Sequence, residues 1–142
     1  MTNNSALKAF LCVTVVAMLG SRGVISQGSN SAAQAATESW VALVDQEQYA
    51  ASWQAAAASF RGAVPEQKWA EAVGAARRPF GGLKSRSVKS STATKTLPGA
   101  PDGEYVVLQF NTAFEKKAVA LETITVVHDV DGQWRVVGYF VK

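Results

Sequence analysis

Residues 104–141 read EYVVLQFNTAFEKKAVALETITVVHDVDGQWRVVGYFV, the most regular pattern in this 142-residue chain. Two short polar breaks, Glu115-Lys116 and Asp131-Gly132, divide it into three largely apolar runs, and the second break is a typical two-residue hairpin turn. Short connections of this kind join antiparallel neighbours. We expect one strand from each run, over residues 104–114, 118–130 and 133–141.

Upstream of this stretch the apolar residues change from strand spacing to helical spacing. Residues 83–97 are long, polar and rich in Ser, Thr and Lys, which is typical of an edge strand, and a loop follows at 98–103. Before them, apolar residues at i, i+3, i+4 and i+7 indicate three helices, over residues 36–44, 49–60 and 65–78. The fold class is therefore α+β, with three N-terminal helices packed on a four-stranded antiparallel meander.

The turn positions predict the register of the strands. Pairing Phe114 with Lys117 places Gln109 opposite Glu122, and pairing Val130 with Gln133 places His128 opposite Arg135 and Ile124 opposite Tyr139. One face is then apolar and should take the helices: Val106, Leu108, Phe110, Leu121, Val127, Trp134, Val136 and Phe140. The other is half apolar and half polar, which favours a partner, a ligand or a second copy of the chain: Tyr105, Val107, Gln109, Glu122, Ile124, Val126, His128, Arg135, Val137, Tyr139 and Val141.

The first 26 residues have the pattern of a secretory signal peptide. Lys8 precedes an apolar run, Ala9 to Leu19, that is shorter than the roughly 20 residues needed to span a bilayer. We expect cleavage after Ser26, with 33–35 as an alternative site and an uncleaved anchor as an alternative fate. The protein is then periplasmic or secreted, with a flexible leader over 27–36, one domain over 37–142 and no membrane span after cleavage.

Composition argues against several kinds of function. The only cysteine, Cys12, lies in the predicted signal, so no disulfide staples the exported domain. Without Lys8 and Arg22, 14 − 2 = 12 basic residues face 11 acidic ones, which is near neutrality. The basic run from Arg77 to Lys95 lacks interleaved aromatic residues, so we expect no nucleic-acid partner. Contact between this run and anionic envelope polymers stays an open, weaker alternative.

We expect no cofactor, no metal and no assignable catalytic residue. Asp129 to Gly132 resembles the start of a calcium loop, but Phe140 stands where the final Glu would be. The only histidine, His128, has no nucleophile or carboxylate that the sequence can assign to it. Seven residues are candidates for binding: Arg77, Arg86, Gln109, Glu122, His128, Arg135 and Tyr139.

Glu122 is the most informative candidate, because it lies in the middle of an apolar strand. A buried carboxylate needs a partner, which Gln109, Arg86 or Arg77 could supply. A buried ion pair that fixes the register is the favoured interpretation, and an acid–base role is the alternative.

Several motifs resemble one family of bacterial proteins. They are Tyr49 with Trp53, Trp69 with Arg77-Arg78 and Gly81-Gly82, LPGAPDGEYVVLQF at 97–110, Glu122-Thr123, and DGQWRVVGY at 131–139. Over about residues 37–142 the chain resembles the domain of unknown function 4019, a family of short exported proteins. The family has no established activity, so the resemblance implies no catalytic residue. The order of helices and strands also resembles cystatin-like or NTF2-like rolls, which implies no function.

We therefore expect an exported, non-enzymatic binding or protein-interaction module. Its partner is an unknown protein or small molecule, and it dimerises through the mixed sheet face. The alternative is a small-ligand carrier or enzyme with a pocket between helices and sheet. In that alternative Glu122 or His128 is the acid–base group and Arg77 or Arg86 holds an anion.

Overall fold

The computed structural model describes residues 22–142, so most of the predicted signal peptide lies outside the described part. Four α-helices and a short 3-10 helix precede four strands, which confirms the α+β class. None of the described helices is long and apolar enough to cross a membrane. The elements are α1 (Arg22–Asp45), α2 (Tyr49–Ala55), α3 (Ala58–Ala63), α4 (Glu66–Arg77), η1 (Arg78–Phe80), β1 (Leu83–Thr94), β2 (Tyr105–Phe114), β3 (Lys117–His128) and β4 (Trp134–Val141).

The first helix begins earlier than the sequence predicts. Residues 27–36, predicted as a flexible leader, belong to α1. The reason is packing: Ala33 and Thr37 are fully buried, and the Thr37 hydroxyl donates a hydrogen bond to the Ala33 carbonyl at 2.8 Å. Burial of one helical stripe stabilises the added turns.

The predicted second helix is divided into α2 and α3. Ala56 and Ala57 are extended, with ψ angles of 165° and 150°, and both are almost fully buried. The Ala57 N–H donates to the Val136 carbonyl of β4 at 2.9 Å. This bond to the sheet outweighs the helical preference of the alanine run, so there are four α-helices and not three.

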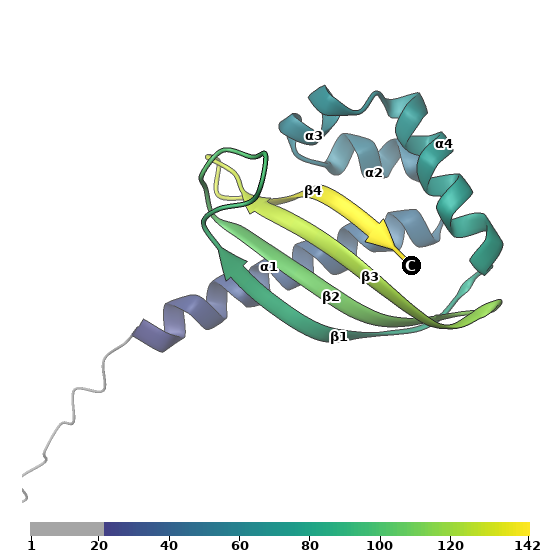
Figure 1. Ribbon diagram of the computed structural model, residues 1–142. Helices are drawn as coiled ribbons and strands as arrows, with labels where there is room; N and C mark the ends of the chain where they lie inside the picture. Colours follow the sequence, from purple (N-terminus) through teal and green to yellow (C-terminus); the bar gives the residue numbers. More distant parts are fainter. Residues whose placement is uncertain (1–21) are drawn as a thin grey trace, which may run out of the picture.

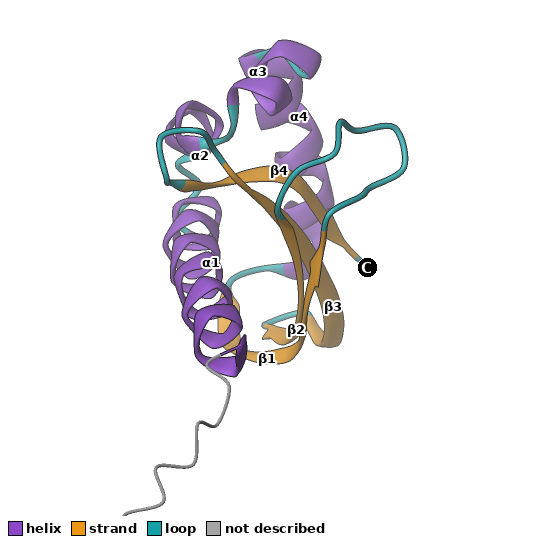
Figure 2. Ribbon diagram, turned by 90° about the vertical axis from the view of Figure 1, so that its left-hand side faces the viewer, coloured by secondary structure: helices purple, strands orange, loops and turns teal. Residues whose placement is uncertain are grey.

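The strands form one antiparallel sheet in the order β1-β2-β3-β4. Helix α1 packs along one side of the curved sheet, and α2, α3 and α4 gather beyond β4 (Figures 1 and 2). We call the side covered by α1 the inner face. The core lies there and consists of Ala33, Trp40, Val41 and Val44 of α1, Trp69 and Val73 of α4, and Val106, Leu108, Phe110, Ile124, Val126 and Val136 of the sheet.

Bulges change the predicted register. Phe114 pairs with Lys117 as predicted, but the register shifts at Ala113, so Glu122 lies opposite Phe110 and not Gln109.

At the other hairpin His128 lies opposite Trp134 and not Arg135. A second shift, at Val137, restores the predicted pairing of Ile124 with Tyr139. A bulge adds one residue to one strand of a pair. Beyond the bulge, each side chain of that strand therefore points to the face opposite to the one that an unbroken register predicts.

The predicted assignment of residues to the two faces is therefore wrong for β3 and, after the shift at Val137, for β4, where Tyr139 lies on the inner face and Phe140 on the outer one. Glu122, Ile124 and Val126 are buried on the inner face, while Leu121 and Val127 lie on the opposite side. We call that opposite side the outer face. Its paired positions and bulge residue are Ser85, Ser87, Ser90, Thr92, Thr94, Tyr105, Val107, Gln109, Asn111, Ala113, Leu121, Thr123, Thr125, Val127, Arg135, Val137, Gly138, Phe140 and Lys142.

Candidate functional site

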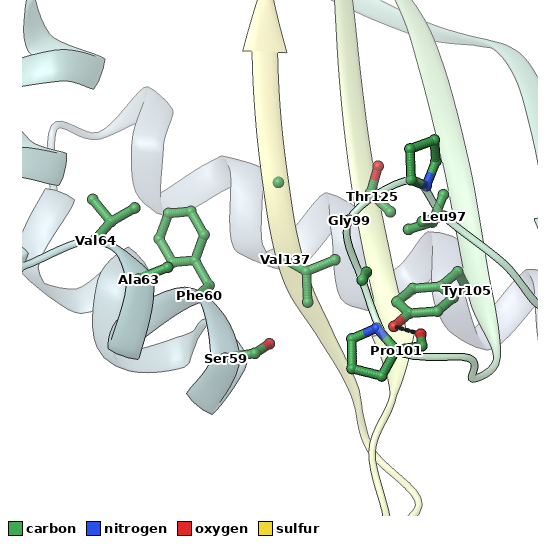
Figure 3. A pocket seen from close by; sticks show the side chains of 13 residues that line it. Ser59, Phe60, Ala63, Val64, Leu97, Gly99, Pro101, Tyr105, Thr125 and Val137 are labelled. Atoms are coloured by element: carbon green, nitrogen blue, oxygen red, sulfur yellow. Dashed lines mark hydrogen bonds between the residues drawn. The ribbon is translucent and has the colours of Figure 1, made fainter.

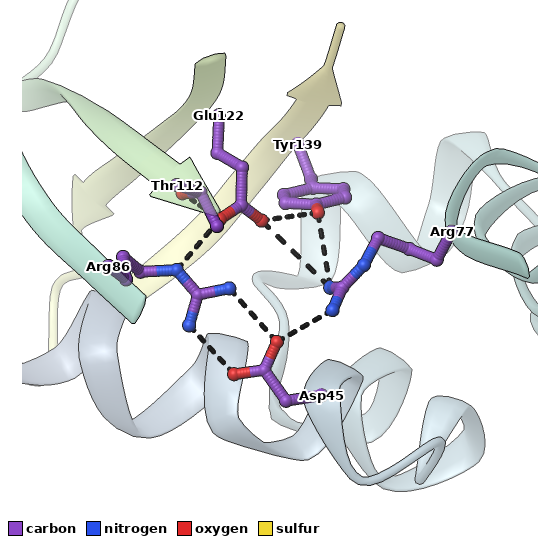
Figure 4. A network of polar contacts seen from close by, with 6 residues as sticks. All are labelled: Asp45, Arg77, Arg86, Thr112, Glu122 and Tyr139. Carbon is purple, nitrogen blue, oxygen red and sulfur yellow. Dashed lines mark hydrogen bonds and ion pairs between the residues drawn. The ribbon is translucent and has the colours of Figure 1, made fainter. Parts of the chain in front are cut away.

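Six polar side chains meet between α1, α4 and the inner face of the sheet. We call them the polar cluster: Asp45, Arg77, Arg86, Thr112, Glu122 and Tyr139 (Figure 4). Six elements contribute, since Asp45 ends α1, Arg77 ends α4, Arg86 lies in β1, and β2, β3 and β4 supply the other three. The cluster thus joins the helical layer to every strand.

Glu122 is the centre of the cluster and has no exposed surface (0%). Its Oε1 accepts hydrogen bonds from Arg86 Nε at 2.7 Å and from Thr112 Oγ1 at 2.6 Å. Its Oε2 accepts the Tyr139 hydroxyl at 2.5 Å and lies 3.9 Å from Arg77 Nη1. The predicted pairing of Glu122 with Arg86 and Arg77 is confirmed, and the carboxylate is fully engaged.

Asp45 is the second carboxylate of the cluster and bridges the two guanidinium groups. Arg86 binds it with two nitrogens, at 2.7 and 2.9 Å, in the fork geometry that guanidinium and carboxylate favour. Arg77 Nη2 donates to the same carboxylate at 2.8 Å. Two cations and two anions therefore alternate, and the cluster is neutral.

The pKa values in the cluster follow from burial and pairing. Burial alone would raise the pKa of Asp45, but hydrogen bonds from Arg86 and Arg77 outweigh it and lower that pKa below the usual 3.8. Burial raises the pKa of Tyr139, and the neighbouring charge of Glu122 raises it further. Tyr139 consequently stays protonated and donates to Glu122 at any physiological pH.

The cluster offers little for a substrate to react with. Glu122 is enclosed, and a general base must come within hydrogen-bond reach of its substrate. Arg77 is 6% exposed and packs its guanidinium carbon 4.6 Å from the centre of the Phe114 ring, while its Nε has no partner. Two small hollows of about 220 and 190 Å³ border the cluster, and both reach it at Asp45. The geometry is that of a structural ion-pair network.

The structure brings together four of the seven predicted binding residues: Arg77, Arg86, Glu122 and Tyr139. The other three lie elsewhere. Gln109 is on the outer face and accepts a 3.2 Å hydrogen bond from Ser90.

His128 and Arg135 are occupied near the β3–β4 turn. His128 Nδ1 lies 2.7 Å from a carboxylate oxygen of Glu104, and its ring stacks on Trp134 at 4.7 Å between centres. Arg135 pairs with Asp129 at 2.8 Å and with Asp131 at 2.7 Å. Neither residue is within hydrogen-bond reach of the polar cluster.

Sequence reasoning missed two members of the cluster. Asp45 directly follows the last apolar residue of the first predicted helix, where a polar residue is ordinary and gives no sign of a buried ion pair. Thr112 stands between Phe110 and Phe114 on one face of β2, where a lone polar residue is a signal for a buried hydrogen bond. A second signal was the charge balance, because two arginines around one buried Glu122 require another anion.

A groove on the outer side of the sheet is a second candidate site. Its walls are α3 with Val64 on one side and residues 97–101 on the other, and Thr125, Val137 and Gly138 form its floor. The cavity volume is about 460 Å³. Figure 3 shows Val137 between Phe60 and Pro101, which stand on opposite walls.

Residues 36–139 match the model of the family described as "Protein of unknown function (DUF4019)". The chain is a member of the DUF4019 family. No curated protein and no solved structure matches it significantly. The family match thus covers helices α2 to α4, strands β1 to β3 and most of β4 of this DUF4019 protein, together with the last turns of α1.

The two candidate sites of this DUF4019 protein differ in chemistry. The polar cluster is neutral overall and largely buried, and small hollows reach only its edge. The groove has no charged residue in its lining, the rest of the outer face carries few charges, and both are open to solvent.

Proposed function

We propose that this DUF4019 protein is an exported, non-enzymatic interaction module that pairs with a second copy of itself through the outer face of its sheet. The observation that carries the proposal is the scarcity of charge on that face. Its charged residues are Arg135, which Asp129 and Asp131 neutralise, and Lys142, whose backbone pairs with Leu121. Surfaces that stay in water typically carry about 25–35% charged residues, whereas the centres of interfaces are depleted of them.

An exposed aromatic residue on the outer face supports the same proposal. Phe140 is 60% exposed and lies opposite Thr123, beside Leu121. A large apolar side chain on a flat, uncharged surface is typical of a contact with another protein. Lys84 and Lys89, at the register shifts of β1, charge the edge of the sheet and discourage pairing there. The contact therefore belongs to the faces of β2, β3 and β4.

A second copy is the partner that fits this surface best. Two faces that carry little charge do not repel each other. A second copy related by a two-fold axis presents the same face, so it meets this condition. Two sheets can stack face to face at about 10 Å, with the side chains of each filling the gap.

The dimer is tested by light scattering coupled to size-exclusion chromatography. We expect the purified protein to be a dimer at about 100 µM, well above the micromolar Kd of a weak specific interface. Thr123→Lys places like charges near the centre of the contact and should give a monomer. Val130→Lys is the matched control, because Val130 is fully exposed in the β3–β4 turn and should leave the dimer intact. A monomeric wild-type protein would overturn the proposal.

Export is supported by the sequence of residues 1–26 and needs its own test. Expression of the full chain in a bacterial host, followed by cell fractionation and mass spectrometry, should recover a periplasmic or secreted form that begins at Gln27. Recovery of the unprocessed chain from the cytosol would contradict this part of the proposal.

A further inference from the structure

We infer that the groove between α3 and the 97–101 segment is a binding site for a small, uncharged, apolar molecule. The floor of the groove, Thr125 and Gly138, is the next pair on the same face after Thr123 and Phe140, around which the dimer contact is proposed. The lining of the groove includes neither Thr123 nor Phe140, so the inference goes beyond dimerisation and stands without it.

The chemistry of the lining sets the class of ligand. No charged side chain contributes to the groove, and its walls carry the rings of Phe60, Pro101 and Tyr105. The hydroxyl of Tyr105 is already used, because it donates to the Pro101 carbonyl at 2.7 Å. Ser59 and Thr125 supply the remaining side-chain hydroxyls, so a ligand with one or two polar atoms can be matched. A carboxylate or phosphate would find no cation within the lining.

The walls of the groove are fixed by contacts with the rest of the fold. Trp53 Nε1 donates to the Val64 carbonyl at 2.7 Å, and Phe60 packs edge-on against Trp69 with 5.2 Å between ring centres. The opposite wall is held by the Tyr105 hydrogen bond and by Gly103 N–H, which donates to the Lys95 carbonyl at 3.0 Å. A site with fixed walls loses little conformational freedom when a ligand binds.

The position of the groove favours a small molecule over a peptide. A peptide that adds a strand needs the free edge of a sheet, but the groove lies over the face of β3 and β4. At the nearby edge, the Val136 carbonyl already accepts the Ala57 N–H. A volume of about 460 Å³ accommodates about 15 non-hydrogen atoms at about 30 Å³ each.

Gly138 provides a sharp test because it forms the floor without a side chain. A Cβ at this position would meet only Thr125 Cβ, at 4.0 Å, so a larger residue fits the backbone and projects toward the groove. Gly138→Leu should fill the groove and keep the strand at least as stable, since leucine suits a strand better than glycine. Thr92→Leu is the matched control, because it adds an apolar side chain on the outer face, in β1, outside both the groove and the proposed dimer contact.

The probe is N-phenyl-1-naphthylamine, a neutral apolar dye whose fluorescence rises when it leaves water. We expect saturable binding to the wild type and to Thr92→Leu, and binding weakened about tenfold or more in Gly138→Leu at an unchanged Tm. The monomeric Thr123→Lys protein should bind the dye like the wild type, which separates this site from the dimer contact. Absence of saturable binding, or equal binding by Gly138→Leu, would overturn the inference. A short apolar peptide that competes with the dye while small apolar alcohols do not would overturn the assignment to a small molecule.

Discussion

Glu122 illustrates what a fully buried charge requires. An isolated carboxylate in the core would be costly, and here three hydrogen bonds and a nearby guanidinium compensate it. A buried ion pair need not stabilise a fold more than well-packed apolar residues at the same positions would. Removal of one partner of the pair, however, is strongly destabilising. The residue therefore acts on the stability of the fold and on the register of β3.

Replacement of Glu122 by Gln keeps the size of the side chain and removes the charge that balances Arg86 and Arg77. We expect the free energy of unfolding to fall by about 3–5 kcal/mol, the cost typical of breaking a buried ion pair from one side. Urea unfolding followed by tryptophan fluorescence measures the change. Glu104→Gln is the control, since that carboxylate is exposed at the surface, and its effect should stay below about 1 kcal/mol. Equal effects of the two substitutions would argue against a structural role for Glu122.

The lowered pKa of Asp45 predicts that the fold loses stability in acid. Its pKa is lowered in the folded state, so its ionised form stabilises the fold fully above the ordinary value of 3.8. This contribution is lost as the pH falls from there through the folded-state pKa. The difference in unfolding free energy between the wild type and Asp45→Asn should be constant between about pH 5 and 7 and shrink below about pH 4. A difference that does not depend on pH would contradict the role of the charge.

At the scale of single elements, the sequence predicts turns and helical stripes well and bulges poorly. The turns at Glu115-Lys116 and Asp131-Gly132 are local signals, and both hairpins form where they were expected. The shifts at Ala113 and Val137 leave the alternation of apolar residues within each strand unchanged, so no pattern reveals them. One undetected residue was enough to place Glu122 on the wrong face, although its arginine partners were predicted correctly.

The division between α2 and α3 has the same origin, because a contact with a distant strand decides it. An alanine run favours a continuous helix, and only the Ala57 bond to Val136 ends it. Local signals were sufficient at two other places. The exposed lysines are typical of an edge strand, and β1 lies at the edge of the sheet. Pro65 lies directly before α4, close to the predicted start of that helix.

Proline substitutions at the α2–α3 junction test that bond. Ala57 has φ −61°, which proline can adopt, but Ala57→Pro removes the N–H that Val136 requires and places ring carbon against its carbonyl. We expect a loss of about 1–3 kcal/mol in unfolding free energy, because a buried carbonyl is left without its donor. Ala58→Pro is the control at the first turn of α3, where proline is favoured, and it should be neutral or stabilising by about 0.4–1 kcal/mol. Thermal unfolding of both variants gives the comparison, and a loss in Ala58→Pro alone would contradict it.

At the scale of the whole molecule, the helices divide their tasks. Helix α1 covers the inner face from β1 to β4, while α2, α3 and α4 close the end of the core beyond β4 (Figure 1). On the other side of the sheet, the described residues that flank it are the 97–101 segment over Tyr105 and α3 at the groove. This asymmetry is why we propose the outer face, and not the polar cluster, as the surface for binding.

The extent of α1 gives a prediction about the domain boundary. A chain that starts at Thr37 lacks Ala33, whose side chain is fully buried, and loses the helical turn that holds it. We expect such a chain to have a Tm lower by several degrees than one that starts at Gly28, since 1 kcal/mol shifts the Tm of a domain of this size by about 4–8 °C. Equal Tm values would show that the domain begins at Thr37, as the sequence alone predicts.

The polar cluster joins residues that lie far apart in the sequence. This separation has a consequence for the rates of folding and unfolding. Arg86 reaches 41 positions back to Asp45, and Arg77 reaches 62 positions forward to Tyr139. Such groups meet only when distant segments of the chain have come together, so we expect their contacts to be completed after the rate-limiting barrier of folding. In that case they set how long the native state persists and not how fast it is reached. In stopped-flow experiments Glu122→Gln should accelerate unfolding manyfold and leave the refolding rate nearly unchanged, so the lifetime of the folded protein would depend on this one carboxylate.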